Sequence, residues 1–397
     1  MYKIKVVSIL VLSFFLLSFS ATAKPIVIWH QKEQAAKFIK QELEHLADRM
    51  GFEVQVTYMP TNDLKSALIK SIIQKIPPDI VLAPADFISY RQQLALSKIN
   101  LEEFDIGDIS KQSWQTVSSH NKIYGIPLIV GNNLLFYYNK KYVTSPATTW
   151  QEIQHQNINF KKIMVNPIGW NYREVYYFLP FLSAFDALPI KNNTPIFNNK
   201  NMKAAMTFYK ALSTSGMINL NCDYDCSFKK FIQGKYVYSI NGDWAYSELK
   251  KALGDNLGLT KLPSIQGKPM KSYMSSISWI FPKNSLQGHH SEHIKSIVTL
   301  SLSENFQYQL YKQFNLTPAI QKVQDKIKQS EKSDYALILQ LLQHSVVIAP
   351  EPALSAVWLS LQKGFDYFLS ANVNPDKVVK IMQKSALREL QYINIQK

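Results

Sequence analysis

The chain has 397 residues, of which 46% are hydrophobic and 18% charged, and its formal net charge is +15. This length exceeds one typical hydrophobic core, so two domains are expected, and the apolar content excludes a largely disordered protein. The positive charge is spread as short lysine pairs without long basic runs, which is typical of a solvated surface and argues against nucleic-acid binding.

Residues 1–23 have the pattern of a cleavable secretory signal. Lys3 and Lys5 precede an apolar run over residues 6–19, and two alanines form the small-residue pattern of a cleavage site before Lys24. The run is too short for a comfortable membrane span, and no later stretch reaches about 18 uninterrupted apolar residues. No cysteine follows the cleavage site, so a lipid anchor there is not expected. We therefore expect a mature protein that begins near Lys24 and is released into a periplasm.

The first part of the mature chain alternates strand and helix patterns. The β-type run IVIWH is followed by a helical pattern that Gly51 ends, by the strand FEVQVTYM, by a helix over residues 61–76 and, after a Pro-Pro breaker, by the strand DIVLAP. Strands joined by helices in this way form a parallel, doubly wound α/β sheet, which binds ligands at the carboxyl ends of its strands. Those ends are residues 30–33 and 84–87.

The second half continues this alternation. The β-rich run over residues 123–143 is broken by Gly-Asn-Asn and predicts either a strand pair or a crossing between lobes. Thr149 and Glu152 form a capping box that starts a helix. Further predicted elements are a strand at KKIMVNP, helices ending near residues 182 and 212, a strand over 273–281, helices over 294–314 and 334–344, a turn-rich IAPEPALSAVW and a last helix over 375–390.

The chain has two cysteines, Cys222 and Cys226. An exported protein can oxidise such a pair, so we expect a local disulfide, although so small a loop would stabilise the fold little. No histidine lies nearby, and a zinc site is therefore not predicted. We interpret the pair as a brace for a turn.

The stretch YVYSINGDWAYSEL is the most informative of the chain. A β-rich run breaks at Asn-Gly-Asp and places Trp244 at the start of a new helix. Such a corner offers backbone N–H groups to ligand oxygens, and the indole offers a flat apolar face to a sugar ring. The alternative is that Trp244 fills the core beneath the turn, which is the role we expect for Trp150 and Trp279.

Seven landmarks occur in order: IVIWH, PPDIVLAPADF, YGIPLIVGNNLLFYYNKK, SPATTWQEI, FIQGKYVYSINGDWA, KLPSIQGKP and LSAVWLSLQKG. With these landmarks the chain resembles the periplasmic solute-binding proteins of sugar importers over nearly its whole mature length. The resemblance implies a two-lobed α/β periplasmic-binding-protein fold of type II, in which each lobe is a mostly parallel sheet flanked by helices. Crossing hinge segments near residues 130–132, 275–281 and 329–334 would join the lobes, with the ligand in the cleft between them. The expected lobes are residues 24–131 with 281–330, and residues 132–280 with 331–397.

The resemblance also implies site residues. Trp244 and Trp358 match two stacking tryptophans of the maltose-binding members, and Asp86 matches a carboxylate that hydrogen-bonds sugar hydroxyls. The loop with Trp170 and Tyr172 falls where the family places another aromatic contact, although its length differs.

Four positions depart from the pattern of the maltose-binding members. Phe87 replaces an arginine, Asn132 a cleft glutamate, Gln362 a helix arginine and Ala83 a tryptophan. These departures leave the identity of the sugar open.

A sugar has apolar C–H faces and a rim of hydroxyls, so its site needs aromatic planes and polar groups at the edge. The candidates for this edge are Glu33, Asp86, Asn132, Asp243 and Gln362.

Several candidates also have a purely structural interpretation. Glu33 and Gln362 fit exposed helix positions, and Asp243 fits a helix cap. Trp358 shares a helical face with Leu354 and other apolar residues, which is also the pattern of a core position.

Two other chemistries are weakly indicated. Ser227 and Lys230 fit a Ser-x-x-Lys nucleophile pattern, but the companion motifs Ser-Asp-Asn, Lys-Thr-Gly and Gly-x-Ser-x-Gly are absent, so no enzyme is expected. The GHHSEH segment carries four residues that could capture zinc in a solvated loop. These are His289, His290, Glu292 and His293.

The main alternative to a sugar-binding protein is a protein of the same fold that binds an anionic polyol, such as glycerol 3-phosphate or a glycerophosphodiester. The net positive charge and the Trp29-His30 start favour it, and helix N-termini can hold a phosphate without arginine. The primary prediction is a monomeric, non-catalytic protein without a cofactor that captures a saccharide. It would deliver this ligand to an ABC-type permease and its ATPase.

Overall fold

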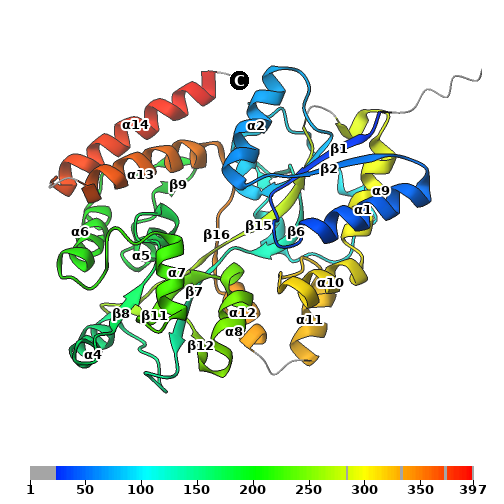
Figure 1. The fold of residues 1–397 in the computed structure, drawn as a ribbon. Coiled ribbons are helices and arrows are strands. Elements are labelled where there is room, and N and C mark those ends of the chain that lie inside the picture. The colour runs from blue at the N-terminus through cyan, green and yellow to red at the C-terminus, as the bar shows by residue number, and fades with distance from the viewer. Residues whose placement is uncertain (1–23, 283–284, 331–333, 371–372, 396–397) are drawn as a thin grey trace, which may run out of the picture.

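The computed structural model describes residues 24–282, 285–330, 334–370 and 373–395. The predicted signal over residues 1–23 lies outside the described residues. Two lobes lie side by side in Figure 1, each built from a sheet and the helices around it. No helix in these four described ranges is long and apolar enough to span a membrane.

The first lobe is built on a six-stranded sheet with the order β16-β15-β3-β1-β2, in which β6 also pairs with β15. Strands β1, β2 and β3 pair in parallel and are connected by α1 and α2, so the predicted α/β start is confirmed. Gly51 ends α1 in the left-handed conformation, as its position in the pattern predicted. The elements are β1 (Ile26–His30), α1 (Ala36–Met50), β2 (Val54–Tyr58), α2 (Thr61–Ile73), β3 (Ile80–Pro84), a 3-10 helix (Ala85–Tyr90), a second (Leu101–Glu103), α3 (Lys111–Gln115), β4 (Ser118–Ser119), β5 (Lys122–Ile123), β6 (Ile126–Gly131), β15 (Tyr273–Ile280), α9 (Ser291–Ser301), α10 (Glu304–Phe314), α11 (Gln321–Ser330) and β16 (Val346–Val347). Helix α12 (Asp334–Gln343) contacts both lobes, since Tyr335 packs on Tyr311 of α10 and Asp334 pairs with Lys250 of α8.

The second lobe is built on a four-stranded sheet with the order β12-β7-β11-β8. This sheet is mixed: β11 pairs in parallel with β8, whereas β7 is antiparallel to both β11 and β12. Strands β11 and β12 are both antiparallel to β7, so β8, β11 and β12 run in one direction and β7 in the other. The elements are β7 (Leu134–Asn139), α4 (Trp150–Lys162), β8 (Asn166–Gly169), α5 (Val175–Ala184), β9 (Ile190–Lys191), β10 (Thr194–Pro195), α6 (Lys200–Thr214), α7 (Tyr224–Ile232), β11 (Tyr236–Gly242), a 3-10 turn (Asp243–Ala245), α8 (Tyr246–Leu253), a second turn (Gly254–Asn256), β12 (Leu257–Thr260), β13 (Ser264–Ile265), β14 (Lys268–Pro269), α13 (Pro352–Ser370) and α14 (Pro375–Ile395).

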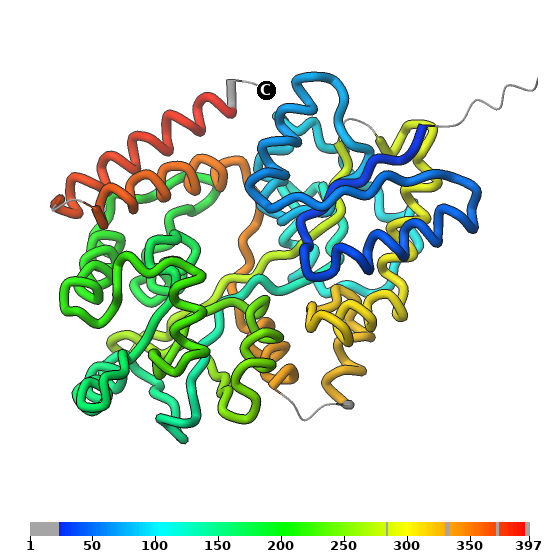
Figure 2. Tube along the Cα trace, in the orientation of Figure 1, coloured from blue at the N-terminus to red at the C-terminus, as the bar shows by residue number. Residues whose placement is uncertain are grey.

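Each lobe is assembled from segments that are far apart in the sequence. In Figure 2, α9 lies beside α1 in one lobe, while α14 lies beside α6 in the other. Strand β15 is buried along its whole length and runs antiparallel between β3 and β6 of the first sheet. The predicted boundary at residue 280 places β15 in the second lobe, but its pairing with β3 and β6 makes these eight residues part of the first sheet. Strand β16, also predicted in the second lobe, pairs with β15 in the same sheet. The other predicted lobe boundaries stay a prediction.

The β-rich run over residues 123–143 is a crossing between the lobes. Strand β6 belongs to the first sheet and β7 to the second, so the chain passes from one sheet to the other at Gly131 and Asn132. Both residues have positive φ values, 137° and 56°. This backbone conformation explains why the break consists of glycine and asparagine, which tolerate it best.

Three predicted elements differ from the structure. The KKIMVNP segment is not one strand, because α4 continues to Lys162 and β8 begins only at Asn166. The helix predicted over residues 294–314 is two helices, because the Ser303 hydroxyl accepts the Phe306 N–H and starts α10 anew. The PALSAVW part of the turn-rich segment is helical and opens α13 at Pro352.

We expect Gly131→Ala to damage the crossing. A Cβ at this position would lie 2.1 Å from Asp243 Oδ2, and φ is 137°. The variant should lose more than about 2 kcal/mol of unfolding free energy, measured by urea denaturation. Gly51→Ala is the matched control, because it also has positive φ but meets nothing within 4 Å, and it should lose only about 1 kcal/mol. Equal losses would show that backbone conformation alone, and not the contact with Asp243, requires Gly131.

Candidate ligand-binding cleft

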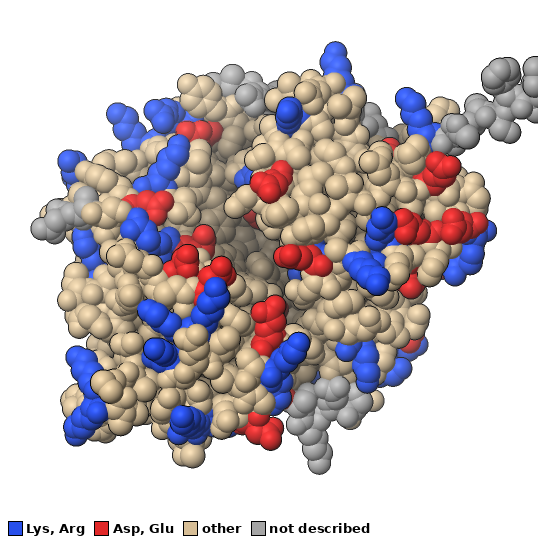
Figure 3. Space-filling view, viewed as in Figure 1, with Lys and Arg blue, Asp and Glu red and all other residues tan. Residues whose placement is uncertain are grey.

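A cleft of about 540 Å³ lies between the two sheets, and Figure 3 shows the hollow with acidic side chains at its edges. Its walls come from both lobes. The first lobe contributes the chain that follows β1 and β3, strand β15 and the residues after α10, and the second lobe contributes α5, α13 and the corner after β11. The carboxyl ends of β1 and β3 therefore reach the cleft, as the strand and helix order predicted.

Tyr58 lines the cleft from the first lobe, and three aromatic side chains form its second-lobe wall: Trp244, Tyr176 and Trp358. All three are partly buried, and the rings of Trp244 and Tyr176 lie 6.3 Å apart at an angle of 50°. The indoles pack with one part against the hydrophobic cores and with another part against the cleft. The buried Nε1 of Trp358 has no hydrogen-bond partner among the described residues. The two tryptophans are thus neither sealed core residues nor free surface residues.

Asp243 joins the crossing to the corner that carries Trp244. Its carboxylate Oδ2 accepts the backbone N–H of Asn132 at 3.1 Å, and its own N–H donates to the Asn133 carbonyl at 3.0 Å. Tyr137 adds a third bond, since its hydroxyl donates to the Gly242 carbonyl at 2.9 Å. These bonds fix the corner after β11 to the point where the chain changes lobes.

Tyr176 and Asn132, which both line the cleft, are hydrogen-bonded to each other. The Tyr176 hydroxyl donates to the Asn132 carbonyl, and the Asn132 side-chain amide lies 3.3 Å from the same hydroxyl. Burial and the nearby carboxylates of Asp243 and Asp86 raise the pKa of Tyr176, so its hydroxyl is neutral and able to donate. Sequence reasoning missed Tyr176, because it lies in an apolar helix pattern with no polar neighbour to mark it.

The cleft carries more negative than positive groups. Its lining residues include Glu33, Asp86 and Asp243, and Lys32 is the one lysine or arginine among the described lining residues. Burial raises the pKa of Asp243 to about 7, an effect that the nearby Lys32 ammonium opposes. Burial likewise raises the pKa of Asp86, with Lys65 opposing, and lowers the pKa of Lys32, with Asp243 opposing. Lys32 was not predicted, although it lies between Glu33 and the end of β1.

The structure does not bring Trp170, Tyr172 and Gln362 to the cleft. Trp170 and Tyr172 are 1% and 0% exposed in the second core, where both hydrogen-bond to Tyr209. The Tyr172 ring stacks on the Tyr209 ring at 4.4 Å, so the loop after β8 turns inward against α6. Gln362 donates to Asp366 one turn further along α13 and does not line the cleft. The expectation of ligand contacts from these three residues is corrected accordingly.

Other candidate residues also lie away from the cleft. His30 is 1% exposed, and burial lowers its pKa to about 4. The Ser227 hydroxyl donates to the Tyr224 carbonyl at 2.9 Å inside α7, as a helix residue does. The ring of His293 stacks on Phe52 at 4.3 Å, and the residues that the structure describes contain no cluster of three potential metal ligands.

The fold and the cleft define a two-lobed solute-binding protein. A family model described as bacterial extracellular solute-binding protein matches residues 34–336, which is most of the chain. The chain therefore belongs to this family.

The individual relatives of this chain have low sequence identity to it. The chain is 22% identical over 390 residues to a maltotriose-binding protein of Pyrococcus abyssi, covering 92% of this chain and 82% of that protein. It is 21% identical over 301 residues to the maltodextrin-binding protein MdxE of Bacillus subtilis, covering 71% and 70%. Among solved structures it is similar to the maltose/maltodextrin-binding domain MalE from Bdellovibrio bacteriovorus bound to maltotriose. The TM-score is 0.80 with 22% identity, over 93% of this chain and 100% of that one. This similarity confirms the predicted fold class.

We expect Asp243→Asn to change how stability depends on pH. The pKa of Asp243 is about 7 in the folded protein against 3.8 for an ordinary aspartate, so the folded state binds this proton more tightly than the unfolded state. Protonation of Asp243 therefore adds to the free energy of unfolding below pH 4, and this contribution is lost as the pH rises through 7. The melting temperature of the variant relative to the parent should therefore be higher at pH 8 than at pH 4. Glu248→Gln, an exposed carboxylate on α8, is the control. If the melting temperatures of variant and parent differ by the same amount at pH 4 and at pH 8, the free-energy cost assigned to burying the Asp243 carboxylate is contradicted.

Proposed function

We propose that the chain captures a short oligosaccharide of the maltodextrin type between its lobes and passes it unchanged to an ABC-type importer. The observation that carries this proposal is the wall of Trp244, Tyr176 and Trp358 in a cleft edged by carboxylates and amides. Flat aromatic faces suit the C–H faces of pyranose rings, and the polar edge groups suit their hydroxyls. The two maltodextrin-type relatives and the maltotriose-bound structure support the same ligand class.

The charges of the cleft favour a neutral ligand over an anionic polyol. A phosphate would enter a space lined by three carboxylates and one lysine, with no arginine or histidine among the described lining residues. Raised carboxyl pKa values indicate that negative charge is already costly there. An added anion would increase this cost, whereas sugar hydroxyls can donate hydrogen bonds to Glu33, Asp86 and Asp243.

The proposed ligand contacts are those of the cleft residues. Trp244 and Trp358 would stack on the sugar, while Glu33, Asp86, Asn132 and Asp243 would bind its hydroxyls. Ala83 and Phe87, which replace a tryptophan and an arginine of the maltose-binding members, are 0% and 2% exposed and do not line the cleft. The pattern of hydrogen bonds at this end of the site should therefore differ from that of maltose-binding members.

Capture would proceed by closure of the lobes around the sugar, as in other periplasmic binding proteins. The ligand can shift the balance between open and closed forms only by its difference in affinity for the two. A sugar held by Trp244 from one lobe and Asp86 from the other makes both contacts only in the closed form. A periplasmic location, with removal of residues 1–23, fits the extracellular solute-binding family.

Replacing a cleft tryptophan should weaken sugar binding without unfolding the protein. Trp244→Ala and Trp358→Ala should each reduce the affinity for maltotriose by about 1–3 kcal/mol, because each removes a stacking surface. Titration calorimetry measures the affinity, and urea denaturation measures the stability. Trp150→Ala is the control: Trp150 is 1% exposed in the second core, and its loss should cost about 3–5 kcal/mol of stability.

The ligand class is tested with the same protein. Maltotriose should raise the melting temperature, and glycerol 3-phosphate should not, because only a bound ligand stabilises the folded state. Stabilisation by glycerol 3-phosphate alone, with an affinity that falls steeply with salt, would overturn the proposal in favour of the anionic ligand. Stability losses in Trp244→Ala and Trp358→Ala as large as in Trp150→Ala, with unchanged affinity, would assign both tryptophans to the core.

A further inference from the structure

Helix α14 packs against the rest of the second lobe by one face. The buried residues of this face include Val378, Val379, Met382 and Ala386. Gly364 of α13 lets the two helices approach closely, because a Cβ there would lie 2.2 Å from the Met382 Cγ. In Figure 1, α14 and α13 lie together at the outer edge of the lobe. The opposite face of α14 is therefore open to solvent.

Polar contacts also fix α14 to the lobe. The Gln383 Oε1 accepts the backbone N–H of Phe197 at 2.7 Å, and its Nε2 donates to the Pro195 carbonyl at 2.9 Å. In the first turn of α14, Asp376 pairs with Lys203 of α6. The side chains on the solvent face are thus presented by a firmly held helix.

The solvent face of α14 combines cations with apolar side chains. From residue 377 to residue 392, the exposed positions recur every three or four residues, so they share one face of the helix. Apart from one glutamine, they comprise four cations and three apolar side chains, and none is a carboxylate. These residues, which we call the α14 stripe, are Lys377, Lys380, Lys384 and Arg388 with Ile381, Leu387 and Tyr392.

The cations of the α14 stripe form one row along the helix. They are spaced by three, four and four residues, which spreads them over about 16 Å of helix length. Among the described residues, only Arg388 of this row has an acidic partner, the Glu389 carboxylate at 3.8 Å. The three lysines of the row are therefore available to an anionic partner.

The exposed face of α1 shows the more usual arrangement. There, lysines and an arginine alternate with carboxylates, and Lys40 pairs with Glu44 at 3.7 Å. Such a face is typical of a solvated surface. Helix α6, which contacts α14, contains no acidic residue. Figure 3 shows more blue than red side chains at the upper left, where Figure 1 places α14, so the stripe lies in a region of mainly positive charge.

We propose that the α14 stripe binds the surface of a membrane that contains anionic lipids. Its lysines and arginine suit anionic headgroups, and its apolar side chains suit the layer just beneath them. Ile381, Leu387 and Tyr392 are 45%, 41% and 61% exposed. A soluble polyanion such as a nucleic acid would use the cations but would leave these apolar side chains in water. The combination therefore favours a lipid surface.

Binding at this surface would keep the protein close to the membrane that holds its importer. Only this use rests on the proposed function, because attachment to lipid needs neither the cleft nor a sugar. The cleft has the opposite balance of charge, with three carboxylates and one lysine among its described lining residues. Lipid binding and sugar binding can therefore be measured independently.

The test measures sedimentation of the full-length mature protein with vesicles, without sugar. At about 0.1 M salt, vesicles of phosphatidylglycerol and phosphatidylcholine in equal parts should bind the protein, and vesicles of phosphatidylcholine alone should not. The triple variant Lys377→Gln, Lys380→Gln, Lys384→Gln should bind the anionic vesicles about 100-fold more weakly, because each lysine contributes about five-fold at such a surface. Ile381→Asn with Leu387→Asn should weaken binding by about 3- to 10-fold, although all cations remain.

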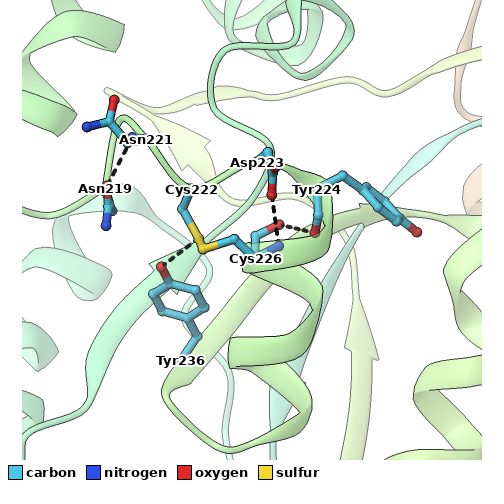
Figure 4. Close-up of a disulfide and its surroundings, with 8 residues drawn as sticks. Asn219, Asn221, Cys222, Asp223, Tyr224, Cys226 and Tyr236 are labelled. Carbon is cyan, nitrogen blue, oxygen red and sulfur yellow. Dashed lines mark hydrogen bonds between the residues drawn. A yellow bond between two sulfur atoms is a disulfide. The ribbon is translucent and has the colours of Figure 1, made fainter.

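The matched control removes the same charge elsewhere in the second lobe. Lys229→Gln, Lys235→Gln and Lys251→Gln change three exposed lysines on α7, just after it and on α8. The Cys222–Cys226 disulfide closes the start of α7, as Figure 4 shows, so this segment should stay folded. The control variant should bind anionic vesicles as tightly as the parent does, and melting temperatures check that all variants are folded.

Three results would overturn the proposal. The first is a parent protein that does not bind the anionic vesicles. The second is an equal loss of vesicle binding in the control variant, which would show that net charge alone matters. The third is heparin binding as tight as vesicle binding, with no effect of Ile381→Asn and Leu387→Asn on the vesicles, which would assign the stripe to soluble polyanions.

Calorimetry with maltotriose separates this proposal from the proposed function. The triple lysine variant should bind maltotriose as the parent does, because the α14 stripe does not line the cleft. A parent that binds anionic vesicles but not maltotriose would contradict the proposed ligand and leave the lipid surface supported.

Discussion

The hydrogen bond from the Asn132 N–H to the Asp243 carboxylate is the constraint on which the cleft depends. It joins the point where the chain leaves the first sheet to the point where β11 ends and the cleft wall begins. Gly131 is needed beside it, since a side chain there would occupy the space of the Asp243 carboxylate. Any rotation of the lobes about this crossing must therefore be transmitted to the corner that carries Trp244. The position of the aromatic wall and the geometry of the crossing are coupled through one carboxylate.

Asp243 also accounts for the electrostatic character of the cleft. Its burial is costly, as its pKa of about 7 indicates, and Lys32 from the opposite lobe reduces that cost. No contact ion pair joins Lys32 and Asp243 in the part of the chain that the structure describes, although their charges interact and both residues line the cleft. A neutral sugar would replace water on both groups without adding charge. This balance favours a saccharide over a phosphorylated ligand, despite the net positive charge of the whole chain.

Much of the fold could be predicted because local patterns agree with the tertiary structure. The alternation from β1 to β3, the Gly51 stop and the break at Gly131 depend on backbone preferences that are visible in the sequence. Glu33 and Asp86 could be predicted as cleft residues because they follow the carboxyl ends of parallel strands. The capping of α10 by Ser303 was missed because the apolar pattern continues across the break between α9 and α10.

The side chains of the second lobe were harder to predict. Trp170 and Tyr172 are residue types that sugar sites use, yet both are buried against Tyr209 of α6. Their burial depends on where α6 packs, which the local sequence does not show. Tyr176 was missed for the opposite reason, since its apolar helix gives no sign that one residue faces the cleft.

A crystal structure of the mature protein grown with maltotriose tests the central claim most directly. The sugar should lie between the lobes, with pyranose rings against Trp244 and Trp358 and hydroxyls bonded to Asp86 and Asp243. A maltotriose molecule bound elsewhere, or a cleft whose tryptophans make no contact with it, would contradict the claim that this aromatic cleft is the ligand site.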